Sequence, residues 1–175
     1  MFKVIAAVVA VLIAILLGYA ATRPDTFRVQ RAISIKAPPE KIFVLINDLR
    51  SWTSWSPYER RDPAMKRSHS GASSGEGAIY EWEGDSQVGT GRMEIIESVP
   101  SSRVVLKLDF VKPFEAHNTA EFTLVSDGDA TEVTWAIHGP STFVSKVMSV
   151  FVSMDKMIGK DFEAGLVNLK AVAEK

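Results

Sequence analysis

The C-terminal segment Pro140–Lys175 places the strongest constraint on what this chain can fold into. Apolar residues recur in it at steps of three or four, the spacing of one side of an α-helix. They are Phe143, Val147, Phe151, Met154, Ile158, Phe162, Leu166 and Leu169. Gly139-Pro140-Ser141 is typical of a helix start, and Gly159 permits a break. The pattern predicts either one kinked helix or a short helix followed by a long one, and a stripe this long needs a large apolar partner.

A strand and two short helices are predicted ahead of that partner. Phe27–Lys36 alternates between apolar and polar residues, with Val29, Arg31, Ile33 and Ile35 on one side. This alternation is typical of a half-buried strand. Ala37-Pro38-Pro39-Glu40 ends the strand and begins a helix. Trp52 and Trp55 follow in a second short helical segment, where we expect them to pack in the core at a corner.

The middle of the chain then changes to a period of two, which predicts antiparallel strands and supplies the partner for the helix. Alternate residues lie on one apolar strand face in each of four segments: Ala78–Trp82, Val104–Phe110, Ala116–Leu124 and Val133–Ile137. Arg92–Ser98 forms a further strand. Asp127-Gly128-Asp129 is a hairpin turn signal. The expected fold is of the α+β class, a curved antiparallel sheet of about six strands wrapped around the long C-terminal helix.

The N-terminal segment Val4–Ala21 is an unbroken apolar run of 18 residues. As a helix it would be roughly 27 Å long, close to the thickness of a bilayer core. Residues 1–22 are therefore interpreted as an uncleaved single-pass membrane anchor in preference to a cleaved signal peptide. Lys3 before the run favours export of the domain, whereas Arg23 and Arg28 after it favour the cytoplasm. We expect the exported orientation, and one globular domain at residues 26–175.

The composition excludes several other classes of site. The net charge of −1 argues against a nucleic-acid partner, and the absence of cysteine excludes disulfides and thiolate metal sites. His69, His117 and His138 are too far apart to suggest metal ligands. The Asp127/Asp129 pair is interpreted as a turn. No metal and no cofactor are expected.

Three stretches resemble a known family. They are Ile33–Phe43 with its Ala-Pro-x-Glu-x-x-Phe element, Asp48–Pro57 with Trp-x-x-Trp, and Gly159–Leu166 in the closing helix. The chain from about Phe27 to Lys175 resembles the polyketide cyclase/dehydrase and lipid-transport family, of the START-like SRPBCC superfamily with the helix-grip fold. This resemblance implies a cavity between sheet and long helix that holds an apolar or amphipathic small molecule. It specifies neither the ligand nor a reaction.

The candidate ligand-binding residues are those expected to face that cavity. They are Tyr80, Trp82, Arg92, Glu94, Asn118, Phe122, Trp135, Met154, Ile158 and Phe162. The alternation does not decide which side of the strand that carries Arg92 and Glu94 faces inward, because Ile96 shares their side while Met93 and Ile95 lie on the other. His117 and His138 are expected to point outward and His69 to lie in a polar loop, so no residue is assigned a catalytic role.

Three functions follow from this. The favoured one is a membrane-tethered, non-catalytic module that binds a hydrophobic small molecule or lipid. The second is a cyclase, dehydratase or hydrolase acting on a bound apolar substrate, which would need a titratable group in the cavity. The third is an interaction or stress-response domain whose groove is filled by its own side chains.

Overall fold

The computed structural model describes all 175 residues. The chain begins with α1 (Phe2–Ala21), β1 (Thr26–Ile35) and α2 (Pro39–Asn47), and continues with the short 3-10 helices η1 (Leu49–Ser54) and η2 (Pro57–Arg60). Six strands follow: β2 (Lys66–Gly71), β3 (Ala78–Glu83), β4 (Thr90–Val99), β5 (Arg103–Lys112), β6 (Ala116–Asp127) and β7 (Ala130–Pro140). The chain ends with α3 (Phe143–Phe151) and α4 (Met154–Ala173).

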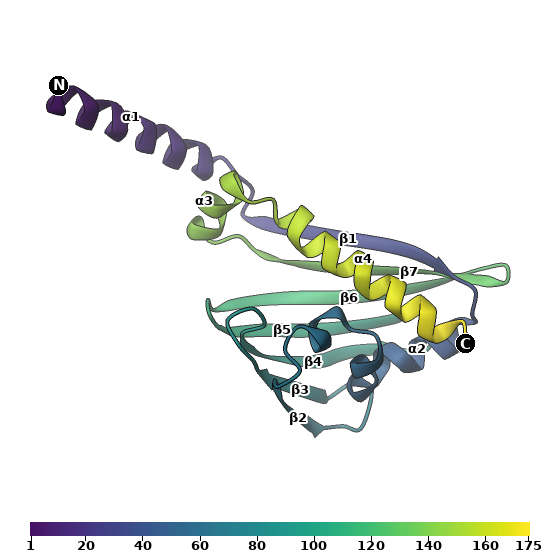
Figure 1. Ribbon diagram of the computed structural model, residues 1–175. Coiled ribbons are helices and arrows are strands. Elements are labelled where there is room, and N and C mark those ends of the chain that lie inside the picture. Colours follow the sequence, from purple (N-terminus) through teal and green to yellow (C-terminus); the bar gives the residue numbers. More distant parts are fainter.

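One antiparallel sheet holds all seven strands in the order β1-β7-β6-β5-β4-β3-β2. The chain runs as a meander from β2 to β7, and β1 closes it by pairing with β7 from Thr26↔Pro140 to Ile35↔Thr131. The sheet curves, and α4 lies across its inner face beside β1 (Figure 1). The predicted fold class, a curved antiparallel sheet with a long C-terminal helix, is confirmed.

The core lies between the sheet and the C-terminal half of α4, and aromatic rings dominate it. Trp135 stacks on Phe162 with ring centroids 4.0 Å apart and on Phe122 at 4.9 Å. Trp52 and Trp55 meet these rings edge-on, at 5.7–6.2 Å. Their indole N–H groups donate to the carbonyls of Ile46 and Leu45 in α2. Burial with a satisfied N–H confirms the interpretation of both as core residues.

The C-terminal stripe forms two helices, but the break is not at Gly159. Val152 is extended between them, and the Ser153 hydroxyl accepts from the Lys156 N–H at the start of α4. The cap of α3 is Thr142, whereas Pro140 ends β7, so the expected helix start at Pro140-Ser141 was wrong by two residues. Both new helices begin at a hydroxyl side chain that satisfies a free N–H.

Gly159 lies inside α4, at the point where the side chain of Arg31 from β1 crosses the helix and leaves no room for a Cβ. A Cβ at position 159 would collide with the guanidinium of Arg31. That group bonds to Asp155, at 2.9 Å, and to Glu163, at 2.7 Å, one turn on either side of Gly159. The glycine thus permits a close approach between helix and strand, and not a kink.

Two further expectations need correction. Only the second half of the apolar stripe is buried, since Phe162, Leu166 and Leu169 are in the core while Phe143 and Phe151 are exposed. Residues 66–71 form the edge strand β2, which was not predicted. His69 is therefore in a strand and not in a loop.

The N-terminal helix α1 extends away from the domain (Figure 1). Its side chains are exposed except near its C-terminal end, where Ala20 is buried and the helix packs against α3. No residue of α1 belongs to the hydrophobic core. By length and composition α1 is able to cross a membrane, a property it shares with signal sequences.

Candidate functional site: the inner face of the sheet

The inner face of the sheet divides into two halves along the strands. Towards the far end of β6 and β7, Phe122, Trp135 and Phe162 fill the space with stacked rings. Toward the end nearest α1, inward-facing side chains remain partly exposed to solvent. We call this second region the open half and define it by Leu108, Phe110 and Asn118 of the sheet and by Met154 and Ile158 of α4.

On the sheet side, the open half is seen as a rise in the exposure of the inward-facing residues along β5 and β6. In β5, Leu106 is buried whereas Leu108 and Phe110, on the same face, are only half-buried. In β6, Ala120 and Phe122 are buried, whereas Asn118 is only half-buried. Exposure therefore increases toward the α1 end on both strands. Solvent therefore reaches the inner face at this end, whereas the inward residues two to four positions along the same strands are buried.

The α4 side of the open half repeats this gradient. Ile158 lies one helical turn before Phe162 on the same side of the helix, and Met154 lies one turn before Ile158. Phe162 is buried, but Ile158 and Met154 are half-buried. The inward-facing side chains of helix and sheet thus both become more exposed toward the same end of the molecule.

One polar group of the open half is unengaged. The side chain of Asn118 lies against Gly139, where a Cβ would meet its Oδ1. This amide forms no hydrogen bond within the protein, although it offers two donors and an acceptor. It is free to bind a polar group of a ligand.

Tyr80 and Trp82 lie on the inner face of β3, and both are buried. The Tyr80 hydroxyl donates to Glu59 Oε1 over 2.6 Å, and the same carboxylate binds Arg67 at 2.6 Å. Burial, then the bond to Glu59, raises the pKa of Tyr80. The phenol is thus a neutral donor in a closed ion-pair network, and not a free acid or base. Trp82 Nε1 is 3.4 Å from the Val88 carbonyl, and the Trp82 ring meets Phe110 edge-on.

Arg92 and Glu94 lie on the outer face of β4. Met93 and Ile95 are the buried residues of that strand, and Arg92 pairs with Glu94 at 2.8 Å on the other side of the sheet. Ile96 is exposed on this outer side too, next to the register shift after Ile95, and an apolar residue there is why the sequence did not reveal the inward side. The two residues are removed from the site.

The histidines contribute no free acid or base to the open half. The rings of His117 and His138 lie on the outer face, as expected from alternation; His117 bonds to Asp109 at 2.7 Å. His69 packs against the ring of Tyr80, with centroids 4.9 Å apart, and its Nε2 is buried without a partner. No three His, Asp or Glu side chains come together as a metal site would require.

A surface depression of about 460 Å³ borders the sheet at the end nearest α1. Its walls are Thr26, Phe27, Arg28, His138 and Gly139, at the paired ends of β1 and β7. Gly139, against which the Asn118 side chain lies, borders both this depression and the open half. Of the predicted site residues, Asn118, Met154 and Ile158 lie in the open half; Phe122, Trp135 and Phe162 form the adjoining wall.

Comparison with known proteins agrees with this architecture. The sequence profile described as polyketide cyclase / dehydrase and lipid transport matches residues 26–174. The chain belongs to this family. The match covers the whole globular domain and leaves α1 outside it, and no curated protein sequence matches the chain.

Solved structures share the fold of this polyketide cyclase / dehydrase and lipid transport domain at low sequence identity. Protein CV1439 from Chromobacterium violaceum is 15% identical with a TM-score of 0.59, over 87% of this chain and 99% of that one. Major latex-like protein 151 from Panax ginseng is 13% identical with a TM-score of 0.59, over 87% and 100%. The di-domain ARO/CYC protein StfQ from the steffimycin biosynthetic pathway is 9% identical with a TM-score of 0.60, over 85% and 51%.

The family and the geometry together make this a helix-grip domain with a ligand-binding face. Sequence reasoning missed Glu59 and Arg67, because their segment has no periodicity and only the structure brings them to Tyr80. Leu108 and Phe110 were placed on an apolar face but not in the site. Their position near the strand end was the available signal.

Proposed function

We propose that this chain is a membrane-tethered module that binds a hydrophobic small molecule or a lipid in the open half without catalysing a reaction. The observation that carries the proposal is the half-exposed apolar surface of Leu108, Phe110 and Ile158 on an inner face that is otherwise sealed. Full burial of such a side chain is worth about 1.5–3 kcal/mol, and a ligand that covers the part still exposed would contribute roughly half of that. Membership of a family described as polyketide cyclase / dehydrase and lipid transport supports a ligand as the reason for that exposure.

The chemistry of the open half favours an amphipathic ligand. Leu108, Phe110, Met154 and Ile158 offer apolar contacts for a chain or a ring system, and thioether side chains adapt to irregular shapes. Asn118 supplies one polar contact for a carbonyl, carboxylate or hydroxyl group. The aromatic wall of Trp135 and Phe162 limits how deeply the ligand enters. A single acyl chain or a small ring system suits this short site.

The absence of catalysis is proposed because the ionisable groups near the inner face, apart from His69 with its buried, unpartnered Nε2, are engaged with each other. Arg31 is held by Asp155 and Glu163, Tyr80 by Glu59, and Asp161 by Arg61. Burial, and then the charge of Asp161, raises the pKa of Tyr58 as well. A general acid or base needs a titratable group within reach of the substrate. Asn118, the free polar group of the open half, does not titrate.

Binding is tested with residues 22–175, which contain the entire hydrophobic core. A fatty acid carrying an anthroyloxy fluorophore should bind delipidated protein with saturable emission. Ile158→Glu, which places a charge in the open half, should weaken binding about tenfold or more. The matched control is Met157→Glu, one residue along α4 and exposed, which should bind as the parent does.

The two variants also make the test decisive. Circular dichroism and thermal melting of each establish that the domain is folded. Equal weakening by both substitutions, or no saturable emission with the parent domain, would show that the open half is not the binding site.

Tethering and sidedness form the second part of the proposal. We propose that α1 stays attached as a single membrane span and that the domain lies on the extracytoplasmic side, with Lys3 inside. A C-terminal fusion to a phosphatase that is active only after export should be active in cells. An inactive phosphatase, together with an active cytoplasmic reporter fused at the same place, would reverse the orientation.

A further inference from the structure

The helix α3 presents its apolar side away from the protein. Phe143, Val144, Met148 and Phe151 are all exposed, Phe151 to 70%. They lie within one side of the helix, because residues one, five and eight positions after Phe143 fall within about 140° of it at 100° per residue. No residue of α3 is buried. A helix on a domain surface normally has the opposite arrangement, with its apolar side inward.

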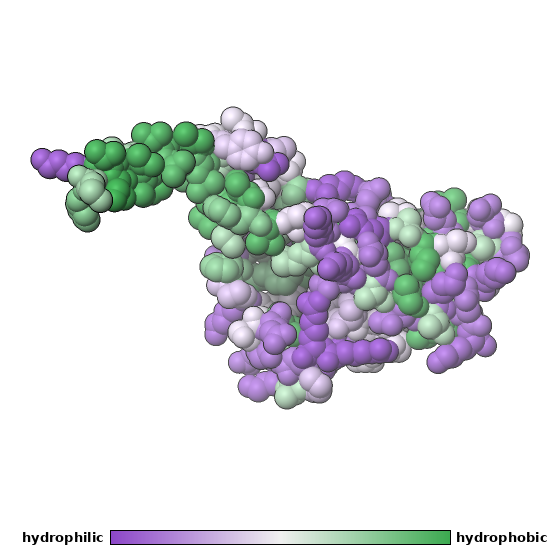
Figure 2. All heavy atoms as spheres, turned by 45° about the horizontal axis from the view of Figure 1, so that its top comes forward, coloured by the Kyte–Doolittle hydropathy of each residue, from purple (hydrophilic) through white to green (hydrophobic).

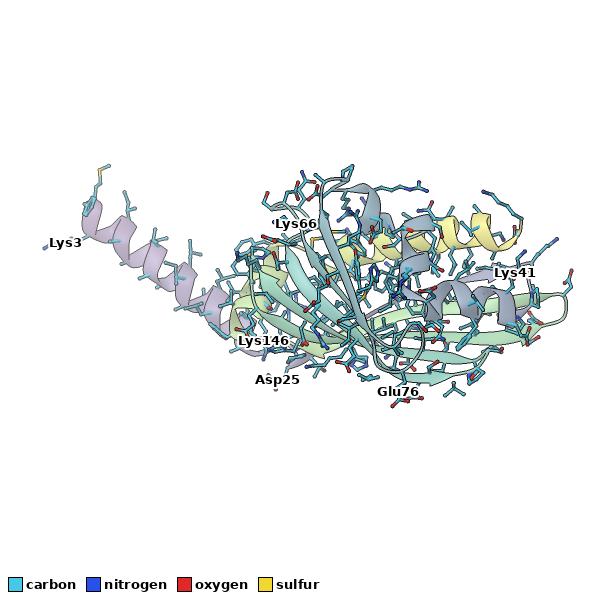
Figure 3. All side chains as sticks on the ribbon, turned by 90° about the horizontal axis from the view of Figure 1, so that it is seen from below. Lys3, Asp25, Lys41, Lys66, Glu76 and Lys146 are labelled. Atoms are coloured by element: carbon cyan, nitrogen blue, oxygen red, sulfur yellow. The ribbon has the colours of Figure 1, made fainter.

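The side of α3 that is half-buried carries Lys146 and Ser149 together with the small apolar residues Val147 and Val150. Lys146 pairs with Asp25 in the linker that follows α1, and its side chain is only 11% exposed (Figure 3). Ser149 donates to the Lys146 carbonyl on the same side. The Lys146–Asp25 pair links this side of the helix to the linker, which leaves the large apolar side chains outward. The orientation therefore rests on the pair with Asp25 and on the packing of α3 against the end of α1.

The apolar side of α3 is continuous with α1. The C-terminal end of α1 packs against α3, and Figure 2 shows the apolar surface of α1 passing into a patch at its base. Two further features lie at this end of the sheet. Phe114, 77% exposed, is in the β5–β6 turn, and Met157 is exposed on the first turns of α4. In each case the exposed group is large and apolar.

We propose that α3 is a membrane-interface helix, which lies in the surface of the bilayer that α1 crosses and holds the open half against the lipid. The inference deepens the proposed function and rests on the tether formed by α1. If α1 is within the bilayer, the packing of α3 on its end places α3 at the boundary between lipid and water. Interfacial helices bury their apolar side about 5–10 Å into the headgroup and acyl boundary. Met154 and Ile158, which follow α3 directly, then line the site close to that surface.

The charge of the region fits a bilayer without a requirement for anionic lipid. The one charged side chain of α3, Lys146, is only 11% exposed and is paired with Asp25, so the helix presents no free charge to headgroups. Apolar burial, and not attraction to acidic headgroups, supplies the contact. The partner is therefore a lipid surface in general, and the ligand of the open half enters from that surface and not through bulk water.

The test uses the absence of cysteine, which allows single labelling sites in the full chain. Val144→Cys and Ser145→Cys are neighbours, one on the apolar and one on the polar side of α3, and both positions are exposed. Leu12→Cys marks α1, and Asp129→Cys marks the β6–β7 turn at the far end of the sheet. Each is labelled with an environment-sensitive fluorophore in phosphatidylcholine nanodiscs and quenched with nitroxide lipid or with aqueous iodide.

Nitroxide lipid should quench labels at positions 12 and 144 several-fold more than labels at 145 and 129, and iodide should show the reverse order. Iodide quenching at 144 equal to that at 145, with position 12 in lipid, would overturn the interfacial helix and leave the tether intact. Position 12 outside the lipid would overturn the tether itself. Protection of 144 from both quenchers would assign the patch to a second protein chain and also overturn the inference.

Discussion

At the scale of single residues, Gly165 controls how closely α4 approaches the sheet. A Cβ at this position would lie 2.7 Å from Cζ3 of Trp135 and 3.0 Å from Cδ of Pro57, two rigid rings. Gly165→Ala should therefore destabilise the domain by about 1–3 kcal/mol despite the better helix propensity of alanine. Chemical denaturation of residues 22–175 measures it, with the exposed Ala164→Ser as the control. A more stable Gly165→Ala protein would mean that the rings move apart easily.

His117 is the residue with the clearest dependence on pH. Bonding to Asp109 and the charges of Asp109 and Glu115 raise the pKa of His117 above its ordinary 6.5, against partial desolvation. Stabilisation by the protonated ring is thus complete below pH 6.5 and is lost as pH rises through the raised folded-state pKa. An NMR titration should show the His117 midpoint fall toward 6.5 in Asp109→Asn. An unchanged midpoint would show that the ion pair does not exist in solution.

At the scale of elements, Arg31 fixes the first half of α4. It joins β1 to the helix turns that contain Asp155 and Glu163, and this contact raises the pKa of the Arg31 guanidinium while it lowers that of Asp155. Both carboxylates are more than half exposed, so solvent screens the pairs and they contribute little to the free energy of unfolding. Arg31→Gln should leave the melting temperature nearly unchanged. It should speed amide exchange in residues 154–160 and not in 166–173.

Lys66→Gln provides the control for that experiment. It removes an ion pair whose carboxylate, Glu83, is as exposed as Asp155 and Glu163, at the opposite edge of the sheet. Exchange in α4 should be the same as in the parent. Faster exchange along the whole of α4 in Arg31→Gln would instead mean that the ion pairs hold the entire helix.

The elements also show what periodicity reveals. Alternation located β3, β5, β6 and β7, because each has one buried and one exposed face. It missed β2, an edge strand with sequence KRSHSG and no buried side, whose residues pair with β3 without entering the core. Helical spacing found α3 and α4 but not their boundary, because a stripe of apolar residues continues across Val152. Periodicity reports only that a side is apolar, and not whether it faces protein or lipid.

At the scale of the whole molecule, the architecture was predictable and the site was not. The sheet, the long helix and the family follow from local patterns and from three short motifs. The division of the inner face into a filled and an open half depends on distances between residues far apart in sequence. Phe162 and Trp135 were expected in a cavity, but they meet at 4.0 Å and close it. Ring contacts of this kind leave no trace in spacing or composition.

The last prediction concerns the two parts of the molecule, the helix α1 and the domain. Residues 22–175 should melt as one cooperative unit, at a temperature close to that of the full chain, because α1 contributes nothing to the core. Helix α3 should be the exception.

Among helices and strands the main packing partner of α3 is α1, and without α1 a helix of nine residues is marginal in water. Amide exchange should therefore become fast in residues 143–151 alone, while fatty-acid binding is retained. Protection of α3 in the truncated domain would show that Lys146 and Asp25 suffice to hold it, and a loss of binding would show that the open half needs the membrane-proximal helix in place.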